Sequence, residues 1–280
     1  MTDHDPPVNV VRDTVERALA EDLGALGDLT SLAVVSEDAR GTARFVARAP
    51  GVIAGTAAAA EAFVQIDPTV SVTWSVTDGA AVDDGAELGR TEGSIRSLLA
   101  AERTALNLLT HCSGVATLTR RFVDAVAGTG SRIRDTRKTL PGLRALEKAA
   151  VRAGGGFNHR ESLSDALLIK DNHLAHLPLR EAVEGARARW PGRVVEVECD
   201  SLEQVAEAKA VGPDLVLLDN MTPAQVTEAV AVLGGALLVE VSGGVTLETV
   251  RAYAEAGADF VSVGAITHSA PALDIGMDIG

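Results

Sequence analysis

The sequence predicts an α/β fold in which an incomplete (β/α) barrel follows a separate α+β domain. Six short apolar runs in the second half of the chain alternate with helix-like segments, at about 20–25 residues per unit. This rhythm is typical of parallel strands joined by helices. The N-terminal part of the chain lacks the rhythm, and this change of pattern separates the two parts.

The N-terminal part begins with an amphipathic helix over Val8–Leu23, where apolar residues recur at helical spacing. Glycines at positions 24 and 27 end this helix. A long helix is predicted over residues 97–127, and Ser113-Gly114 is the predicted point of any kink. Between these helices the predicted elements are strands at residues 42–47, 51–54 and 70–74 and a helix at residues 57–65.

The apolar runs of the second part are the predicted barrel strands. They lie at residues 132–134, 166–169, 194–197, 215–218, 237–241 and 260–263. The helices predicted between them lie at residues 143–153, 179–190, 202–211, 223–233 and 247–256. Residues 154–157 predict one further short strand. Since this gives fewer strands than the usual eight, closure of the barrel is not expected to be complete.

Every predicted barrel strand ends at a charged residue or a glycine-containing turn. The carboxyl ends of parallel strands converge on one rim, where barrels place their chemistry. The groups concerned are Asp135–Lys138, Lys170–Asn172, Glu198–Asp200, Asp219-Asn220, Ser242–Gly244 and Gly264.

Composition and charge narrow the function classes. The 280 residues carry a formal net charge of −14, which argues against non-specific binding to nucleic acid. No apolar stretch approaches the roughly 20 residues of a membrane helix, and the acidic N-terminus does not resemble a signal peptide. Cys112 and Cys199 form no CxxC pair. We therefore expect a cytoplasmic protein that binds neither nucleic acid nor membrane.

A basic segment interrupts this acidic chain. Residues 132–170 hold nine Lys or Arg against four Asp or Glu, which indicates a site for a small polyanion; an exposed basic helix is the simpler alternative. Arginine suits a carboxylate or phosphate through a bidentate fork, whereas lysine acts as a point charge. His159, taken alone, also fits an ordinary core or surface histidine. The candidate residues are Arg137, Lys138, His159, Arg160 and Lys170.

Two acids, Glu198 and Asp219, end neighbouring strands. Two carboxylates on one rim can hold Mg²⁺, usually with some water ligands retained. Helix-capping or salt-bridged acids are the alternative interpretation. Asp200-Ser201 is assigned to capping of the helix that starts at Leu202.

Glycine-containing turns follow the last two strands. Ser242-Gly243-Gly244 lies between a strand and a helix, and Gly264 follows the next strand. In barrels, such loops often bind phosphate through backbone N–H groups, and glycine lets the backbone approach the anion. Tight-turn chemistry without a ligand is the alternative.

No familiar nucleotide-binding or hydrolase motif accompanies these groups. The sequence has no GxSxG elbow, P-loop, GxGxxG or HExxH, and Cys112 lies in an apolar helix where a core role is expected. The remaining machinery is electrostatic, which favours transfer from a phosphorylated, pyrophosphate-bearing donor. Two other classes stay open: an aldolase-type barrel with Lys170 as a Schiff-base lysine, and a catalytically silent binding or regulatory barrel.

Together these motifs resemble the quinolinate phosphoribosyltransferase family. The similarity spans nearly the whole chain, and its most specific part is the block Arg134–Arg144, RDTRKTLPGLR. The other matching blocks are residues 21–22, 27–31, 101–108, 154–160, 168–173, 196–198, 217–220, 242–244 and 263–269.

The resemblance implies an N-terminal α/β sandwich over residues 1–110, a barrel over residues 111–268 and a tail, residues 269–280, that packs back on the sandwich. It also implies a homodimer with shared active sites, in which Arg103 enters the partner's site. Without the dimer, this arginine looks like a solvated helix residue. The implied reaction, a step of NAD biosynthesis, transfers phosphoribose from phosphoribosyl pyrophosphate to quinolinate with decarboxylation.

The resemblance also implies residue roles. The implied catalytic residues are Lys138, Lys170, Glu198 and Asp219, of which the two acids also bind Mg²⁺. The implied substrate-binding residues are Arg103, Thr136, Arg137, Lys138, His159, Arg160, Lys170, Ser242, Gly243, Gly244, Gly264 and His268. Arg103, Arg137, His159, Arg160 and Lys170 would surround the two carboxylates of quinolinate, and Lys138 would lie near both substrates. Glu198 and Asp219 would face the ribose and the Mg²⁺-pyrophosphate. Ser242, Gly243, Gly244 and Gly264 would hold the 5-phosphate, with His268 close by. Two alternatives keep the barrel but change the substrate: a paralogue acting on another acid, and the related protein of molybdate-transport operons.

Overall fold

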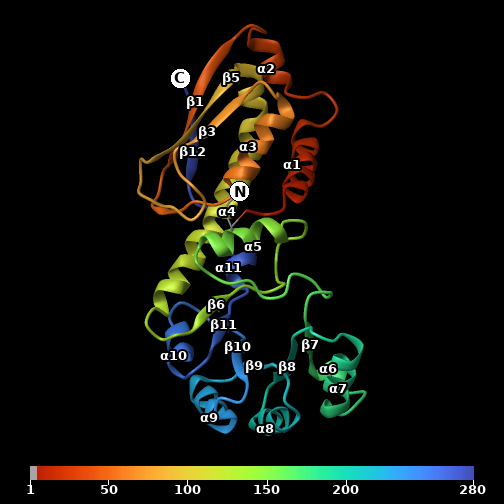
Figure 1. The fold of residues 1–280 in the computed structure, drawn as a ribbon. Helices are drawn as coiled ribbons and strands as arrows, with labels where there is room; N and C mark the ends of the chain where they lie inside the picture. The colour runs from red at the N-terminus through yellow and green to blue at the C-terminus, as the bar shows by residue number, and fades with distance from the viewer. Residues whose placement is uncertain (1–4) are drawn as a thin grey trace. The chain divides into compact units, whose positions relative to one another are not determined.

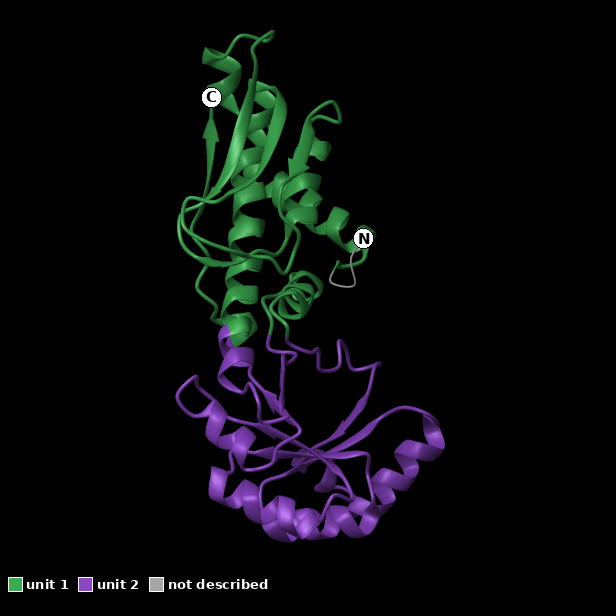
Figure 2. Ribbon diagram, turned by 60° about the vertical axis from the view of Figure 1, so that its left-hand side comes forward, with its two compact units in different colours: residues 1–120, 139–155, 266–280 green, residues 121–138, 156–265 purple. Residues whose placement is uncertain are grey.

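The computed structural model describes residues 5–280 and divides the chain into two compact units (Figure 2). The first unit contains the residues up to Arg120, together with Thr139–Gly155 and Ile266–Gly280. The second unit contains Arg121–Lys138 and Gly156–Ala265. The chain therefore passes from one unit to the other several times, so no single sequence boundary separates them.

The second unit is built on six parallel strands in the order β6-β11-β10-β9-β8-β7 (Figure 1). The strands are β6 (Arg132–Arg134), β7 (Leu167–Ile169), β8 (Val195–Cys199), β9 (Leu215–Asp219), β10 (Leu238–Ser242) and β11 (Phe260–Ser262). Each overlaps a predicted run. The last strand of this unit in the sequence, β11, pairs with the first, β6. The first and last strands of the sequence are therefore neighbours in the sheet. The predicted incomplete (β/α) barrel is confirmed.

The barrel is incomplete between the segment around Phe157 and β7. Residues 154–157, predicted as a further strand, contribute a single parallel bridge between Arg134 and Phe157. Three glycines precede Phe157, and glycine weakens a strand because it has no side chain to pack. Among the described residues, no strand ladder joins this segment to β7.

Helices lie along the outer face of this sheet (Figures 1 and 2). They are α7 (Leu179–Arg189), α8 (Leu202–Val211), α9 (Pro223–Leu233) and α10 (Val250–Glu255), and a short helix, α6 (Asp171–Leu174), follows β7. Ser201 caps α8 by accepting a hydrogen bond from the backbone N–H of Gln204. Asp200 instead donates its backbone N–H to the Gln204 side chain. Of the predicted capping pair, Ser201 is therefore the N-cap residue.

The first unit contains an antiparallel sheet in the order β12-β1-β5-β3 and a small ladder of β2 with β4. The strands are β1 (Arg40–Ala47), β2 (Gly51–Val52), β3 (Ser71–Trp74), β4 (Ala81–Val82), β5 (Glu87–Ser94) and β12 (Ile275–Ile279). The sequence does not predict β5, because ELGRTEGS has few apolar residues and two glycines. Its position between β1 and β3 comes from pairing with both neighbours.

The helices of the first unit are α1 (Val8–Leu23), α2 (Leu29–Val34), α3 (Thr56–Ile66), α5 (Arg144–Ala153), most of α11 (Ala265–His268) and α4 (Ile95–Ala125) up to Arg120. Helix α4 continues through Ser113-Gly114 as one helix. A Cβ atom on Gly114 would lie 3.0 Å from the Cα atom of Ala272. This glycine therefore allows the C-terminal segment to pack closely against α4, which explains a small residue at the predicted kink.

Three aromatic residues pack together in the first unit. The ring centre of Phe45 lies 5.9 Å from that of Phe63 and 4.8 Å from that of Trp74. The buried apolar residues of the second unit are instead mainly aliphatic or alanine, as on its strands β8 to β10.

Candidate active site

A cavity of about 380 Å³ opens at the carboxyl ends of the parallel strands, within the second unit. Its lining residues are Thr136, Arg137, Lys138, His159, Arg160, Leu168, Lys170, Glu198, Leu217, Asp219, Glu240, Ser242 and Ser262. Nine of them are candidate residues from the sequence. The structure therefore gathers most of the predicted site at the rim where barrels place their chemistry.

The cavity has a strongly cationic lining. Arg137, Lys138, Arg160 and Lys170 reach it from three separate segments of the chain. Burial, and then repulsion from Arg137, lowers the pKa of the Arg160 guanidinium. A bound anion would offset both the lost hydration and the repulsion. The lining therefore suits a ligand with more than one negative charge.

Two acids reach the same cavity from neighbouring strands. Glu198 lies one residue before the end of β8, and Asp219 ends β9. The ammonium group of Lys170 forms an ion pair with Glu198, whose side chain is 16% exposed. Asp219 accepts a hydrogen bond of 2.7 Å from the Asn220 side chain. The pair thus places carboxylate oxygens, the ligand type that Mg²⁺ prefers, in the cavity.

The turn after β10 has a backbone form that requires glycine. Gly243 and Gly244 have φ values of 99° and 60°. A Cβ atom on Gly243 would lie 2.8 Å from the backbone nitrogen of Asn220, where it cannot fit. The Asn220 N–H also donates to the carbonyl of Ser242 at 2.9 Å, which ties this turn to the one after β9. Such a turn leaves its backbone open to close approach by a phosphate.

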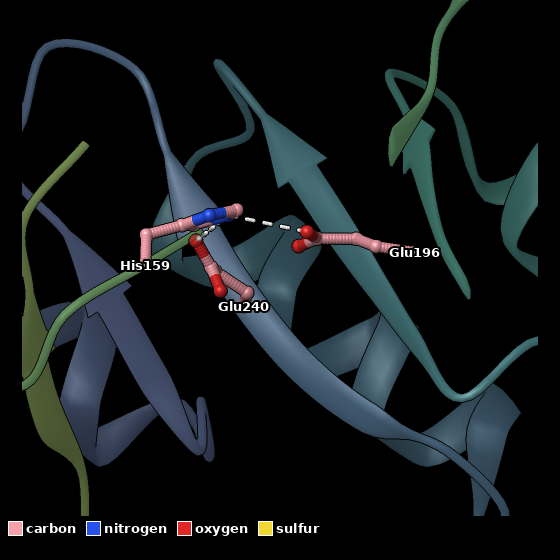
Figure 3. A group of neighbouring side chains, drawn as sticks. All are labelled: His159, Glu196 and Glu240. Carbon is pink, nitrogen blue, oxygen red and sulfur yellow. Dashed lines mark ion pairs between the residues drawn. The ribbon is translucent and has the colours of Figure 1, made fainter. Parts of the chain in front are cut away.

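Deeper in the barrel, His159 faces two buried carboxylates (Figure 3). Its Nε2 atom lies 3.1 Å from Glu196 Oε2 and 3.3 Å from Glu240 Oε1. Arg134 forms a 2.5 Å ion pair with Glu240, and Ser262 donates a hydrogen bond to the same carboxylate. Because Glu240 is fully buried, its charge is balanced entirely by these neighbours.

These contacts determine the charges of the cluster. Burial alone would lower the pKa of His159, but hydrogen bonds to Glu196 and Glu240 outweigh burial and raise the pKa to about 9. Burial raises the pKa of Glu196. Burial also acts to raise that of Glu240, but the contacts with His159 and Arg134 overcome it and lower the pKa. At neutral pH an ionised Glu240 therefore lies between two cations.

The inner cluster of Arg134, Glu196, Glu240 and Ser262 is not among the site residues predicted from the sequence. The sequence nevertheless contains a pattern that points to two of these residues, because alternate residues of a strand face the same side. Glu196 precedes Glu198 by two positions, and Glu240 precedes Ser242 by two positions. The residue two positions before each predicted rim residue was therefore a candidate for the barrel interior.

Five predicted site residues lie outside the set that lines the cavity. Gly243 and Gly244 directly follow Ser242, and Gly264 lies two residues after the end of β11. Arg103 on α4 and His268 on α11 belong to the first unit. The substrate roles of all five remain predictions.

Two alternative chemistries receive little support from the geometry. The ion pair with Glu198 engages the Nζ atom of Lys170, which a Schiff-base mechanism needs as a free nucleophile. Burial raises the pKa of the Cys112 thiol, and burial raises that of Cys199 to about 12. Neither cysteine is therefore a thiolate nucleophile at neutral pH.

The fold and site together define an α/β-barrel enzyme that handles anionic, phosphorylated ligands at the carboxyl ends of its strands. Comparison with known protein families identifies which family of barrel enzymes the chain resembles. Residues 28–113 match the N-terminal domain of quinolinate phosphoribosyl transferase, and residues 115–278 match its C-terminal domain. The chain belongs to the quinolinate phosphoribosyl transferase family.

Individual relatives match this chain over nearly its whole length. The chain is 47% identical to the nicotinate-nucleotide pyrophosphorylase [carboxylating] of Mycobacterium leprae, over 97% of this chain and 98% of the relative. It is 41% identical to a probable enzyme of the same name from Bacillus subtilis, over 92% and 90% of the two chains. The solved nicotinate-nucleotide pyrophosphorylase of Francisella tularensis superposes with a TM-score of 0.94 at 38% identity, covering 99% and 98% of the two chains.

Proposed function

We infer that this chain transfers the phosphoribosyl group of phosphoribosyl pyrophosphate to quinolinate, with release of CO₂, to form nicotinate mononucleotide and pyrophosphate for NAD biosynthesis. The observation that carries this conclusion is one cavity in which a cationic lining and two acids meet, in a chain of this family. Quinolinate is a dicarboxylate, and the donor carries phosphate and pyrophosphate groups. Both substrates therefore need concentrated positive charge.

The cationic lining is the proposed quinolinate subsite. Arg137 and Arg160 can each grip a carboxylate through two N–H groups, while Lys170 contributes a point charge. His159 lines the same cavity and carries positive charge through its inner contacts. Thr136 lies beside these groups. Together they would hold both carboxylates of the pyridine ring and fix its orientation.

The acids and the glycine turns are the proposed donor subsite. Lys138 lies in the same cavity and would contact both substrates. The Ser242–Gly244 turn and Gly264 would hold the 5-phosphate through backbone N–H groups, with His268 close by. Glu198 and Asp219 would face the ribose.

The residues present fit a divalent cation. Glu198 and Asp219 offer carboxylate oxygens from adjacent strands to one cavity, which is the hard donor set that Mg²⁺ takes. They would hold Mg²⁺, which when bound would neutralise charge on the departing pyrophosphate.

The reaction needs no general base at its start, because the ring nitrogen of quinolinate already carries a lone pair. As the bond from C1 of the ribose to pyrophosphate breaks, C1 becomes oxocarbenium-like, and Glu198 or Asp219 can stabilise that positive charge. Bond formation leaves the ring nitrogen positive. This charge favours loss of the adjacent carboxylate as CO₂, because it stabilises the electron pair left on the ring carbon, which then takes up a proton from water.

The decisive experiment incubates the purified protein with quinolinate, phosphoribosyl pyrophosphate and Mg²⁺. We expect equimolar nicotinate mononucleotide and CO₂. Absence of both products would contradict the proposed function. Parallel reactions with nicotinate and other pyridine or benzene carboxylic acids test the alternative that a related acid is the substrate.

A homodimer with shared active sites belongs to the same proposal. Arg103 lies on α4, outside the unit that holds the cavity, and its role is explained if it acts in the partner's site. Mixed dimers of Arg103→Ala and Lys138→Ala subunits should then contain one intact site and regain activity that neither parent shows. Failure to regain activity in verified mixed dimers would count against sharing.

The proposed location is the cytoplasm. Both cysteines are buried and unpaired, which suits a reducing compartment. Among residues 5–280, none of the helices has the length and apolar character needed to cross a membrane.

A further inference from the structure

We propose that Glu240 and Glu196 are positioning residues that orient His159 and keep its ring cationic where it faces the carboxylates of the substrate. The proposal rests on the proposed function, since it assigns His159 to the quinolinate subsite. It adds two buried acids that act through His159 and a third group, Arg134, that keeps one of those acids ionised.

The backbone of His159 is fixed from one side. Asp135, which is fully buried at the end of β6, accepts the backbone N–H of His159 at 2.8 Å. The same carboxylate accepts a 2.6 Å hydrogen bond from the Asn158 side chain. The peptide that carries the ring is therefore held before any substrate arrives.

The ring itself is fixed from the other side. Both inner carboxylates contact its Nε2 atom, at 3.1 Å from Glu196 and 3.3 Å from Glu240 (Figure 3). Two acceptors at one ring nitrogen require that nitrogen to carry a proton. The strands β8 and β10 thus determine which ring nitrogen is protonated and where the ring points.

The other ring nitrogen introduces an opposing effect. His159 Nδ1 lies 2.7 Å from the backbone nitrogen of Arg160, in the geometry of an acceptor, which favours a neutral ring. The two carboxylates favour the imidazolium. The effect of the carboxylates dominates, because a charge-assisted hydrogen bond in a buried site is stronger than one to a neutral backbone group.

The contacts of Arg134 explain why Glu240 can remain ionised in the barrel interior. The guanidinium pairs with Glu240 at 2.5 Å and also lies 4.0 Å from the centre of the Phe260 ring, so it is held on two sides. Ser262 donates to the same carboxylate. The Glu240 charge is therefore stabilised independently of His159. Since these groups already supply cations and a donor, we interpret the cluster as an ion network and not as a metal site.

The charged groups facing His159 come from several elements. Glu196 of β8 and Glu240 of β10 contact the ring, and Asp135 accepts the backbone N–H. Arg134 of β6 pairs with Glu240, and Arg137 and Arg160 line the same cavity as His159. The arginines oppose a positive ring, and the acids favour it. The net effect raises the pKa of His159 to about 9.

The sign of the pH dependence follows. A raised pKa keeps the ring positive below about pH 9, and the favourable interaction with a carboxylate is lost as the pH rises through that value. The KM of the wild type for quinolinate should stay level from about pH 7 to 8 and rise near pH 9. Removing one acid should bring this rise to a lower pH, toward the ordinary histidine pKa of about 6.5.

The first test measures KM and kcat for Glu240→Gln between pH 6 and pH 9.5. We expect a KM for quinolinate about tenfold higher at pH 8, where the variant's ring is mostly neutral, and little change at pH 6. The KM for phosphoribosyl pyrophosphate should stay within about twofold, because that substrate does not contact His159. Glu196→Gln is a second variant that leaves the Arg134 pair intact and should shift the profile in the same direction.

Val239→Ala is the matched control. Val239 is buried on β10 next to Glu240, but adjacent side chains on a strand face opposite sides. The control loosens the same strand without touching His159, so its pH profile should match the wild type. Equal KM profiles for Glu240→Gln and Val239→Ala would overturn the proposal.

The second test follows the His159 ring directly by NMR without substrate, with the His159→Gln spectrum used for assignment. We expect the proton on Nε2 in every neutral form and a lower titration midpoint in Glu240→Gln. An unchanged midpoint would overturn the proposal. If the wild type makes no nicotinate mononucleotide, the proposed function fails, and the NMR result still decides whether Glu240 controls the charge of His159.

Discussion

The rim and the interior of the barrel carry charges on the same strands but use them differently. On β8, Glu198 at the rim is 16% exposed and pairs with a lysine, whereas Glu196, two residues earlier, is 4% exposed and contacts His159. On β10, Ser242 lines the rim and Glu240 is fully buried. Rim charges are available to a ligand, while interior charges are neutralised by neighbouring side chains. The comparison teaches that position along a strand separates binding from positioning.

The largest expected effect on stability is at the interior layer. Glu240→Ala leaves the partly buried Arg134 and His159 without the buried carboxylate that they share, which should lower the free energy of unfolding by about 3 kcal/mol. Urea unfolding followed by circular dichroism measures the loss. The rim counterpart, Glu198→Ala, breaks a half-exposed pair and should cost at most about 1 kcal/mol. Similar losses for the two variants would remove the distinction between the layers.

The largest expected effect on turnover is at the rim. Lys138→Ala or Glu198→Ala should lower kcat about 100-fold or more, because each removes charge from the position where the reaction develops it. The melting temperature should change little. Steady-state rates and thermal melts of the same preparations measure both quantities. If activity and fold are lost together, these residues have structural roles only.

A smaller effect should separate two adjacent glycines. Gly243→Ala places a methyl group against the Asn220 backbone at a φ of 99°, so the turn must move. We expect the KM for phosphoribosyl pyrophosphate to rise about tenfold or more, with a stability loss of about 1–3 kcal/mol. Gly244→Ala is the matched control, because nothing lies within 4 Å of its added carbon and only its φ of 60° is unfavourable. Equal effects would mean that the close approach to Asn220 is unimportant.

The smallest expected effect concerns the cysteines. Both are buried, and burial raises the pKa of the Cys199 thiol to about 12. The native protein should therefore react slowly with a thiol reagent at pH 8 and keep its activity, whereas the urea-unfolded chain should react fully. Rapid loss of activity on modification would contradict the burial of these thiols.

Much of the fold could be predicted because its signals are local. The predicted bounds of α1 are those observed, and all six barrel strands overlap predicted runs. Strand β5 could not be predicted, because ELGRTEGS has little apolar alternation and becomes a strand through its neighbours β1 and β3. The further short strand predicted at residues 154–157 is reduced to one bridge between Phe157 and Arg134, which is all that its three glycines support.

The rim residues could also be predicted, because each follows an apolar run and the ends of parallel strands converge. Glu240 and Glu196 were not predicted, because they lie inside apolar runs and the apolar pattern alone gives no reason for a charged side chain there. Only pairing with Arg134 and His159 makes their burial tolerable, and those partners come from distant parts of the sequence.

The sequence by itself determined the alternation of strands and helices and the chemical groups at the strand ends, because both depend on residues close together in the chain. Only the tertiary structure decided which charges lie inside the barrel and how they are balanced. Balancing a buried charge requires partners within a few ångströms, and in this chain the partners of Glu240 come from β6, β11 and the loop that carries His159.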